Sequence, residues 1–181
     1  MMPIGPLMIE HRLIERMIHL LDSHGSRIRS GSPPDLEFLS EALDFIRTYA
    51  DRCHHGKEED ILFRDLGRKA LSSKDATAMN ELSKDHVWAR GRVKELIDAA
   101  AAWRSGSADA AGRISNALEE LAGFYPEHIR KEDKEFFPLA MKYFSDDEKA
   151  RMLAEMGEFD RKLIHEHYRS VVARCEPPKE K

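Results

Sequence analysis

The sequence predicts an all-α protein, an up-and-down four-helix bundle with an additional C-terminal helix. Glycine and proline are unfavourable inside helices, and they number only 10 and 8 in 181 residues and cluster at a few positions. Between these clusters, apolar residues recur at spacings of three and four, which is typical of one buried helical face. Almost no segment alternates apolar and polar residues, so the sequence gives no indication of a sheet.

The first two helices are predicted at 6–24 and from 36 to about 70. In the first, apolar residues share one face, and Gly25 is expected to end the helix. Residues 25–34 have the composition of a loop. The second helix is long and amphipathic, and Gly67 is expected to fray its end.

The third and fourth helices are predicted at about 74–103 and about 109–143. Serines at 72 and 73 are suitable caps for the third helix, and Ser-Gly-Ser at 105–107 ends it. Pro126 falls inside the fourth helix. It is expected to kink or restart that helix, because its ring removes a backbone donor and crowds the preceding turn.

A fifth helix is predicted over about 146–174, where Ser145 and Glu148 form a capping box. Its apolar stripe must cover part of the bundle. The chain length suits a single domain over 1–174, with a core bundle over about 7–142. The short tail after residue 174 is expected to be disordered.

Composition excludes several classes of partner. Acidic residues outnumber basic residues by 33 to 29, giving a net charge of −4, so no basic footprint for nucleic acid is present. No stretch approaches the roughly 20 apolar residues that span a bilayer, and no signal segment opens the chain. The two cysteines form no CxxC pair. We expect a cytoplasmic protein without nucleic-acid or membrane partners, as a monomer or homodimer.

Several of the nine histidines lie in an internal repeat. The segment 54–63 lines up with 128–137 at an offset of 74, matching a His, a Lys, a Glu, an acidic residue and a Phe. An acidic residue followed by His at 10–11 lines up with a similar pair at 85–86, at an offset of 75. The first two helices therefore correspond to the third and fourth, as two copies of a helical hairpin.

This repeat predicts a metal site in the bundle core. A His and a Glu four residues apart lie on one face of a helix, so each of two helices offers an imidazole and a carboxylate. The partner helices add one imidazole each, at a similar depth in an up-and-down bundle. Buried His and Glu without partners are costly, and a cation removes that cost. The predicted ligands are His11, His54, Glu58, His86, His128 and Glu132.

The ligand types restrict the metal. Imidazole with carboxylate suits iron, manganese or zinc, whereas the absence of thiolates argues against structural zinc and iron–sulfur sites. Six ligands exceed the needs of one tetrahedral zinc, and two carboxylates from symmetric positions can bridge a pair of metals. A di-iron centre is therefore the leading prediction, with zinc or manganese as alternatives. No His is preceded by Glu three residues earlier, so the ferritin-like pattern is disfavoured.

The order His, His-x-x-x-Glu, His, His-x-x-x-Glu resembles the hemerythrin-like family of HHE cation-binding domains. The phrases Glu-His-Arg-Leu-Ile-Glu at 10–15 and His-Ile-Arg-Lys-Glu-Asp at 128–133 strengthen the resemblance, which covers roughly 7–142. The resemblance implies a four-helix bundle with two iron ions joined by an oxo or hydroxo bridge. It also implies a site that binds O2, nitric oxide or peroxide, or senses iron or oxygen.

One position departs from the oxygen-carrying members, which have a second His four residues after the ligand of the third helix. Arg90 stands there, so a coordination position is left for water, a substrate or another side chain. Redox chemistry or sensing is then favoured over reversible oxygen carriage. His55 is expected to face outward, because Ile129 occupies its position in the repeat. Water is favoured for the open position, and the candidate side chains are Tyr125, His167 and Glu15.

Three functions remain open at this stage. The first is a di-iron protein that binds or reduces a small diatomic molecule or peroxide. The sequence decides neither whether this protein is an enzyme nor what its redox partner is. The second is a non-catalytic iron or zinc sensing or storage module. The third is a helical interaction protein whose histidines only pack, which predicts that no metal co-purifies.

Overall fold

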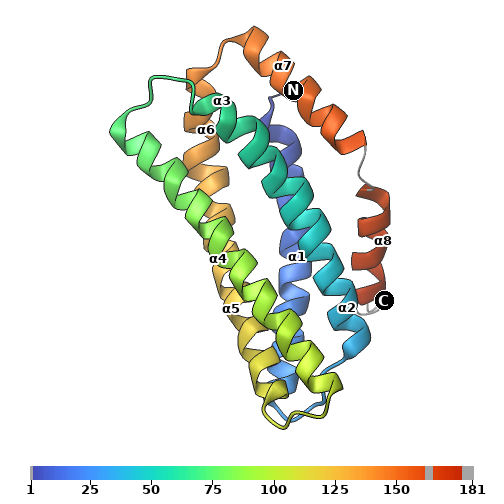
Figure 1. The fold of residues 1–181 in the computed structure, drawn as a ribbon. Helices are drawn as coiled ribbons and strands as arrows, with labels where there is room; N and C mark the ends of the chain where they lie inside the picture. Colours follow the sequence, from blue (N-terminus) through green and yellow to red (C-terminus); the bar gives the residue numbers. More distant parts are fainter. Residues whose placement is uncertain (1, 162–164, 177–181) are drawn as a thin grey trace.

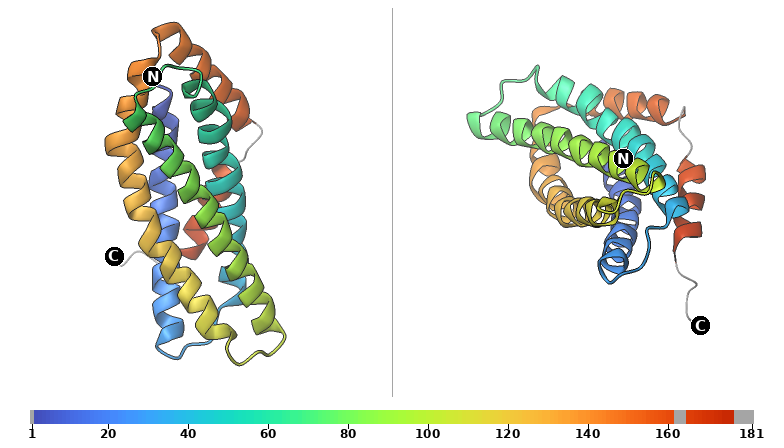
Figure 2. Two further views of the ribbon diagram at one scale, coloured as in Figure 1. Left: turned by 60° about the vertical axis from the view of Figure 1, so that its left-hand side comes forward. Right: turned by 60° about the horizontal axis from the view of Figure 1, so that its bottom comes forward.

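The computed structural model describes residues 2–161 and 165–176, except the side chains of 165–167 and 170. Four long helical segments lie side by side in up-and-down order, and the C-terminal part covers one side of them (Figures 1 and 2). The described residues contain no strand. None of their helices is long and apolar enough to cross a membrane. The predicted all-α bundle with an additional C-terminal part is confirmed.

The first long segment is α1 (Ile4–Arg29), which continues through Gly25, where the sequence predicted its end. A Cβ atom at Gly25 would lie 3.3 Å from Cβ of Leu118 on α5 (Ala110–Lys131). The missing side chain thus allows α5 to pack closely against α1. The chain turns away just after the helix at Gly31, where φ is 98°, a conformation that favours glycine. The predicted helix end at Gly25 is therefore wrong.

The second long segment carries two π-helical stretches. It begins as α2 (Leu36–Asp44), with Asp35 accepting hydrogen bonds from two backbone N–H groups of the first turn. It continues as η1 (Phe45–His55), η2 (Glu58–Phe63) and α3 (Arg64–Leu66), and so ends slightly before the predicted position. In η1 and η2 the backbone hydrogen bonds join residues five apart, a rare pattern that is frequent at functional sites.

The third and fourth segments follow the predicted order. The third is α4 (Ser73–Arg104), which begins at the predicted serine cap. The fourth runs through α5 without a break at Pro126, which lies inside that helix. It then continues as the π-helical η3 (Glu132–Phe136), α6 (Phe137–Ala140) and the short 3-10 helix η4 (Met141–Tyr143).

The C-terminal part contains α7 (Asp146–Arg161) and α8 (His165–Cys175), both within the predicted range of 146–174, and residues 162–164 between them lie outside the described chain. The capping box forms, because the Ser145 and Glu148 backbone N–H groups each bond to the other residue's side chain. α7 packs against η2, and α8 packs against α1 and η1.

The buried apolar side chains form two clusters along the bundle. On α1, Leu7 belongs to one cluster and Ile14 to the other, and His11 lies between them. The buried polar residues thus form a layer between two apolar regions. Water has little access to such a layer, so its polar groups need partners within it.

Candidate metal centre

All six predicted ligands lie in this polar layer, each with no more than 2% of its surface exposed. Every one of the four long segments contributes to the layer, and the second and fourth contribute a His and a Glu each, as the repeat requires. His11 lies on α1, His54 and Glu58 on η1 and η2, His86 on α4, and His128 and Glu132 on α5 and η3.

The side chains form two groups that could each hold a metal ion. Within each group, one ligand atom per residue lies within 4.8 Å of the others. Five of the seven side chains involved are imidazoles, and the remaining two are carboxylates. The first group is His11, His54, Glu58 and Glu132, and the second is His55, His86 and His128.

His55 belongs to the second group, so the prediction that it faces outward is wrong. Its side chain is buried, and its ring is stacked on that of His86 with centroids 3.9 Å apart. The repeat suggested otherwise because the equivalent residue, Ile129, is not a metal-binding type. In η1 the longer hydrogen-bond pattern places more residues in each turn, so His54 and His55 both face the core. The His-His pair itself was the signal in the sequence.

The two carboxylates stand between the groups. Each directs one oxygen at an imidazole of the first group and its other oxygen at an imidazole of the second. A carboxylate in this position can bridge two metal ions. The distances are 3.5 Å from Glu58 Oε1 to His54 Nε2, 3.3 Å from Glu58 Oε2 to His86 Nε2, 3.2 Å from Glu132 Oε2 to His11 Nε2 and 3.3 Å from Glu132 Oε1 to His128 Nε2.

Each of the five imidazoles has a second carboxylate at its Nδ1 atom. Such a partner fixes the ring and the tautomer, and leaves Nε2 as the metal-binding atom. The sequence did not indicate these Nδ1 carboxylate partners, apart from the acidic residues of the repeat. The pairs are His11 with Asp133 at 2.7 Å, His54 with Glu10 at 2.9 Å, His55 with Asp51 at 3.3 Å, His86 with Glu59 at 2.7 Å and His128 with Asp85 at 3.3 Å.

Seven buried atoms at the centre of the layer have no hydrogen-bond partner in the described chain. A buried nitrogen or oxygen without a partner costs about 1–3 kcal/mol, and more when charged. All seven belong to the candidate ligands, and cations placed among them would satisfy them together. They are Nε2 of His11, His86 and His128, and both carboxylate oxygens of Glu58 and of Glu132.

The two central carboxylates have opposite pKa shifts without a cation. Burial and the nearby charge of Glu132 raise the pKa of Glu58 well above its usual range. Burial also opposes ionisation of Glu132, but the imidazoles of His128 and His11 outweigh it and lower the pKa of Glu132 well below its usual range. The pair therefore carries one negative charge and one proton, and a metal would displace that proton.

The pKa values of the imidazoles shift in different directions, because their surroundings differ. Burial, together with the neighbouring imidazole of His86, lowers the pKa of His55 to about 3. Burial also lowers the pKa of His54 well below its ordinary value. For His11, burial is outweighed by the hydrogen bond to Asp133 and by the nearby carboxylate of Glu132, which raise the pKa to about 9. The neutral imidazoles of His54 and His55 are in the form that binds metals.

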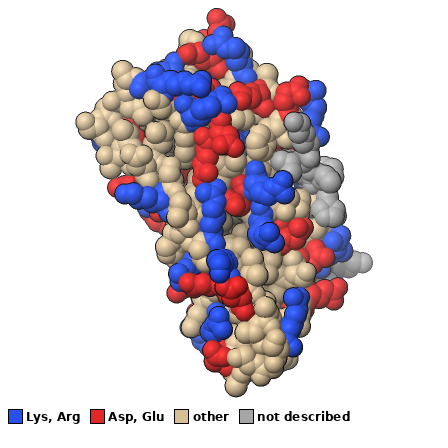
Figure 3. Space-filling model, viewed as in Figure 1, with Lys and Arg blue, Asp and Glu red and all other residues tan. Residues whose placement is uncertain are grey.

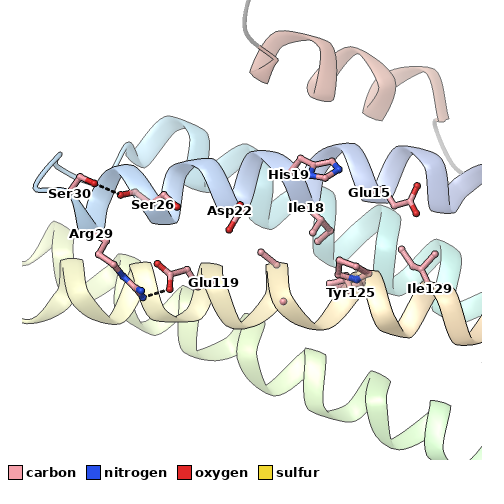
Figure 4. Close-up of a pocket in the computed structure, with 13 residues that line it drawn as sticks. Glu15, Ile18, His19, Asp22, Ser26, Arg29, Ser30, Glu119, Tyr125 and Ile129 are labelled. Atoms are coloured by element: carbon pink, nitrogen blue, oxygen red, sulfur yellow. Dashed lines mark hydrogen bonds and ion pairs between the residues drawn. The ribbon is translucent and has the colours of Figure 1, made fainter.

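Tyr125 and Glu15, two of the candidate additional ligands, lie outside both groups. The Tyr125 ring is buried, with its centroid 6.5 Å from that of His55, and its hydroxyl has no hydrogen bond to any described residue. Burial and the charge of Asp51 raise the pKa of Tyr125, so its hydroxyl stays protonated. Glu15 pairs with Arg12 at 3.0 Å and lines a groove of about 760 Å³ between α1 and α5 (Figure 4).

The third candidate, His167, lies outside the described side chains. Arg90, which replaces a ligand of the oxygen carriers, has a different role. Its guanidinium donates to Asp51 at 2.8 Å and to Glu59 at 3.0 Å. These two carboxylates hold the Nδ1 atoms of imidazoles in the second group, so Arg90 fixes that group from outside. His55 itself supplies the third imidazole of that group.

Lys57 is a buried charge that the sequence reasoning missed. Its ammonium contacts both Glu10 and Asp160, and Glu10 also accepts a hydrogen bond from a candidate ligand imidazole. Burial opposes the charge on Lys57, but Glu10 outweighs it and raises the pKa of the ammonium. A Cβ at Gly56 would lie 3.1 Å from the Phe159 ring. The end of α7 thus rests on the segment that carries the candidate ligands.

We expect Asp160→Asn to lower the free energy of unfolding by about 1–3 kcal/mol, because it removes one of two carboxylates from a buried ammonium. Urea denaturation measures the change. Glu158→Gln is the matched control, since Glu158 is an exposed carboxylate on the same helix. The control should change stability by less than about 0.5 kcal/mol. Equal effects from the two variants would contradict a structural role for the buried pair.

A family model described as Hemerythrin HHE cation binding domain matches residues 2–140. The match contains all seven side chains of the two groups and extends over most of the chain. No curated protein and no solved structure matches the chain. The family match and the buried His and Glu groups support the same conclusion, a cation-binding module on a helical bundle.

Proposed function

The chain belongs to the Hemerythrin HHE cation binding domain family, and we propose that its cation site holds two iron ions. The observation that carries this proposal is the pair of carboxylates whose oxygens are directed at different imidazole groups. One group would supply two imidazoles and the other three, with Glu58 and Glu132 shared between them. Mixed imidazole and carboxylate ligands suit iron, and two ions would give a partner to each of the seven unpartnered atoms of the layer.

We further propose that the centre binds or reacts with O2, nitric oxide or peroxide. Iron supplies redox chemistry and open coordination positions when bound. The group with His11 and His54 would offer four ligand atoms, fewer than the five of the other group, so it leaves more room for a small molecule. The apolar clusters on both sides keep water away. The protonated Tyr125 hydroxyl lies on the side of His55 and His128, and it is available as a hydrogen-bond donor to a molecule bound at that group.

We expect protein expressed in iron-supplemented medium to contain about two iron atoms per chain. Two metal ions are needed because each central carboxylate has one oxygen at each imidazole group. Elemental analysis of protein purified without a His tag measures the ratio, and near-ultraviolet charge-transfer absorption reports a bridged ferric pair. A ratio near one with zinc preferred over iron would exclude the di-iron assignment.

Tyr125→Phe is expected to keep the wild-type metal content but to weaken azide binding to the oxidised centre several-fold, as the loss of about 1 kcal/mol of hydrogen bonding predicts. Neither protein should show a phenolate charge-transfer band, because the pKa of Tyr125 is raised by burial. Visible spectra during azide titration test both points. Tyr49→Phe is the control, a buried tyrosine of the apolar cluster. A phenolate band that disappears only in Tyr125→Phe would show coordination instead.

A second candidate is a non-catalytic iron or zinc sensing or storage module. The contacts of α7 with Lys57 and Gly56 favour it, because they connect the C-terminal part to the candidate ligands. Peroxide assays separate the two functions: a reactive centre consumes peroxide over many turnovers, whereas a sensing module does not. For a sensor, hydrogen exchange of the α7 backbone should also depend on bound metal.

A further inference from the structure

We propose that a basic pocket between η1 and α4 binds a small inorganic monoanion, such as nitrite, beside the metal centre. This proposal rests on the proposed function only for the metal that the anion would approach. The pocket has a volume of about 220 Å³, and His55 and Tyr125 lie on its inner wall. Ile46, Ala89 and Val93 form apolar parts of the lining. Because His55 belongs to the second imidazole group, the pocket reaches the edge of the centre.

The charges of the pocket favour an anion. Three basic residues line it, Arg47, Arg90 and Lys94, against one acidic residue, Asp51. Arg90 pairs with Asp51 and Glu59, and Lys94 pairs with Asp98 at 2.8 Å, so Arg47 carries the unpaired charge. In Figure 3, basic side chains lie along the middle of the face that contains α4, interspersed with acidic ones. Arg47 makes no ion pair with any residue of the described chain. An anion entering between α4 and η1 would therefore meet a basic side chain that no carboxylate neutralises.

The inner part of the pocket offers donors and few free acceptors. Arg90 uses Nε and Nη2 to hold Asp51 and Glu59, and its Nη1 has no hydrogen bond within the described chain. The Tyr125 hydroxyl also lacks a partner there. Asp51 Oδ1 already accepts from Arg90 and pairs with His55 Nδ1. Free donors beside an occupied acceptor suit an anion better than a cation.

The size of the pocket limits the anion. A water molecule takes about 30 Å³ in the liquid, so the pocket holds an ion of a few heavy atoms with some of its water. Apolar side chains form part of the wall, and small, weakly hydrated ions tolerate such surroundings. The pocket therefore admits and holds a small monoanion before it reaches the metal, and no bond is made or broken in that step.

Azide is a suitable probe, because its infrared stretch reports binding with or without iron. We expect the double variant Arg47→Gln with Lys94→Gln to bind azide about tenfold more slowly than wild-type holoprotein, since charged rims raise association rates by this order or more. Added salt should slow the wild type and have little effect on the variant. Arg113→Gln, an exposed charge of α5 outside the pocket, should bind azide as the wild type does. Nitric oxide, which is neutral, should bind all three proteins equally.

Equal azide rates and equal salt dependence in the wild type and the double variant would overturn the proposed pocket. Loss of nitric oxide binding in the double variant alone would also overturn it, because the charge of the ligand would then be irrelevant. Elemental analysis of the same samples keeps the two proposals apart: absence of metal would reject the di-iron function. In that case, the infrared shift of azide in the metal-free protein, and its loss in the double variant, still test the pocket.

Discussion

Removal of the metal is expected to lower the free energy of unfolding by about 4 kcal/mol or more, the value for a ligand present at about 1,000 times its dissociation constant. The structure gives the physical reason. Seven buried atoms of the layer have no partner without a cation, and the burial of Glu58 forces it to keep a proton. The apoprotein must keep these polar atoms buried without partners, or it must open the layer to water. Either response lowers the free energy of unfolding.

Thermal unfolding of holoprotein and chelator-treated protein measures this effect. For a chain of 181 residues, about 4 kcal/mol corresponds to a decrease in Tm on the order of 10 °C. Adding iron back should restore the holoprotein Tm, which excludes damage by the chelator as the cause. Identical melting curves before and after complete metal removal would show that the polar layer is stable by itself, and would favour histidines that only pack.

The helix order could be predicted from the sequence because apolar spacing reports the buried face of each helix. Gly25 shows the limit of that reasoning. A glycine at the end of an apolar pattern usually ends the helix, but this one allows a close approach of α5, and only the packed structure reveals the neighbour. The C-terminal range was predicted from the same helical spacing, and α7 and α8 lie within it on either side of 162–164, which are outside the described residues.

The repeat in the sequence also appears in the hydrogen bonds of the site. Glu10 bonds to His54, and its counterpart Asp85 bonds to His128. Likewise His86 bonds to Glu59, and its counterpart His11 bonds to Asp133. The acidic residue of each repeat thus forms a hydrogen bond with a His on another helix, and not with the His beside it in the sequence. Sequence alone identified the repeated residue types, but not these exchanges between helices, which depend on how the helices pack.

His55 is the point at which the two halves of the repeat differ. Its counterpart is Ile129, and its Nδ1 partner Asp51 has no equivalent among the other four pairs. The 3.6-residue period of an α-helix places adjacent residues on different faces, so it could not predict two neighbouring inward imidazoles. The π-helical η1 changes that geometry. One half of the site therefore has three imidazoles and the other two, which makes the two candidate metal positions unequal.

His55→Ile, which introduces the residue of the equivalent position, is expected to reduce the metal content from two ions per chain toward one. The second group would lose one of its three imidazoles, and the isoleucine side chain would offer no donor in its place. The first group keeps all of its ligands, so one ion should remain bound. Asp51→Asn should have a weaker effect of the same kind, about 10–100-fold in affinity for one ion, because it removes only the Nδ1 partner of His55.

Elemental analysis and the rate of metal release to a chelator distinguish the outcomes. His19→Gln is the control, since His19 is an exposed imidazole of α1, and it should retain two ions with the wild-type release rate. Two ions retained in His55→Ile with unchanged release would mean that water completes the second position, as the sequence alone favoured. Loss of both ions would mean that the bridging carboxylates cannot hold one metal without the other, because Glu58 and Glu132 serve both groups.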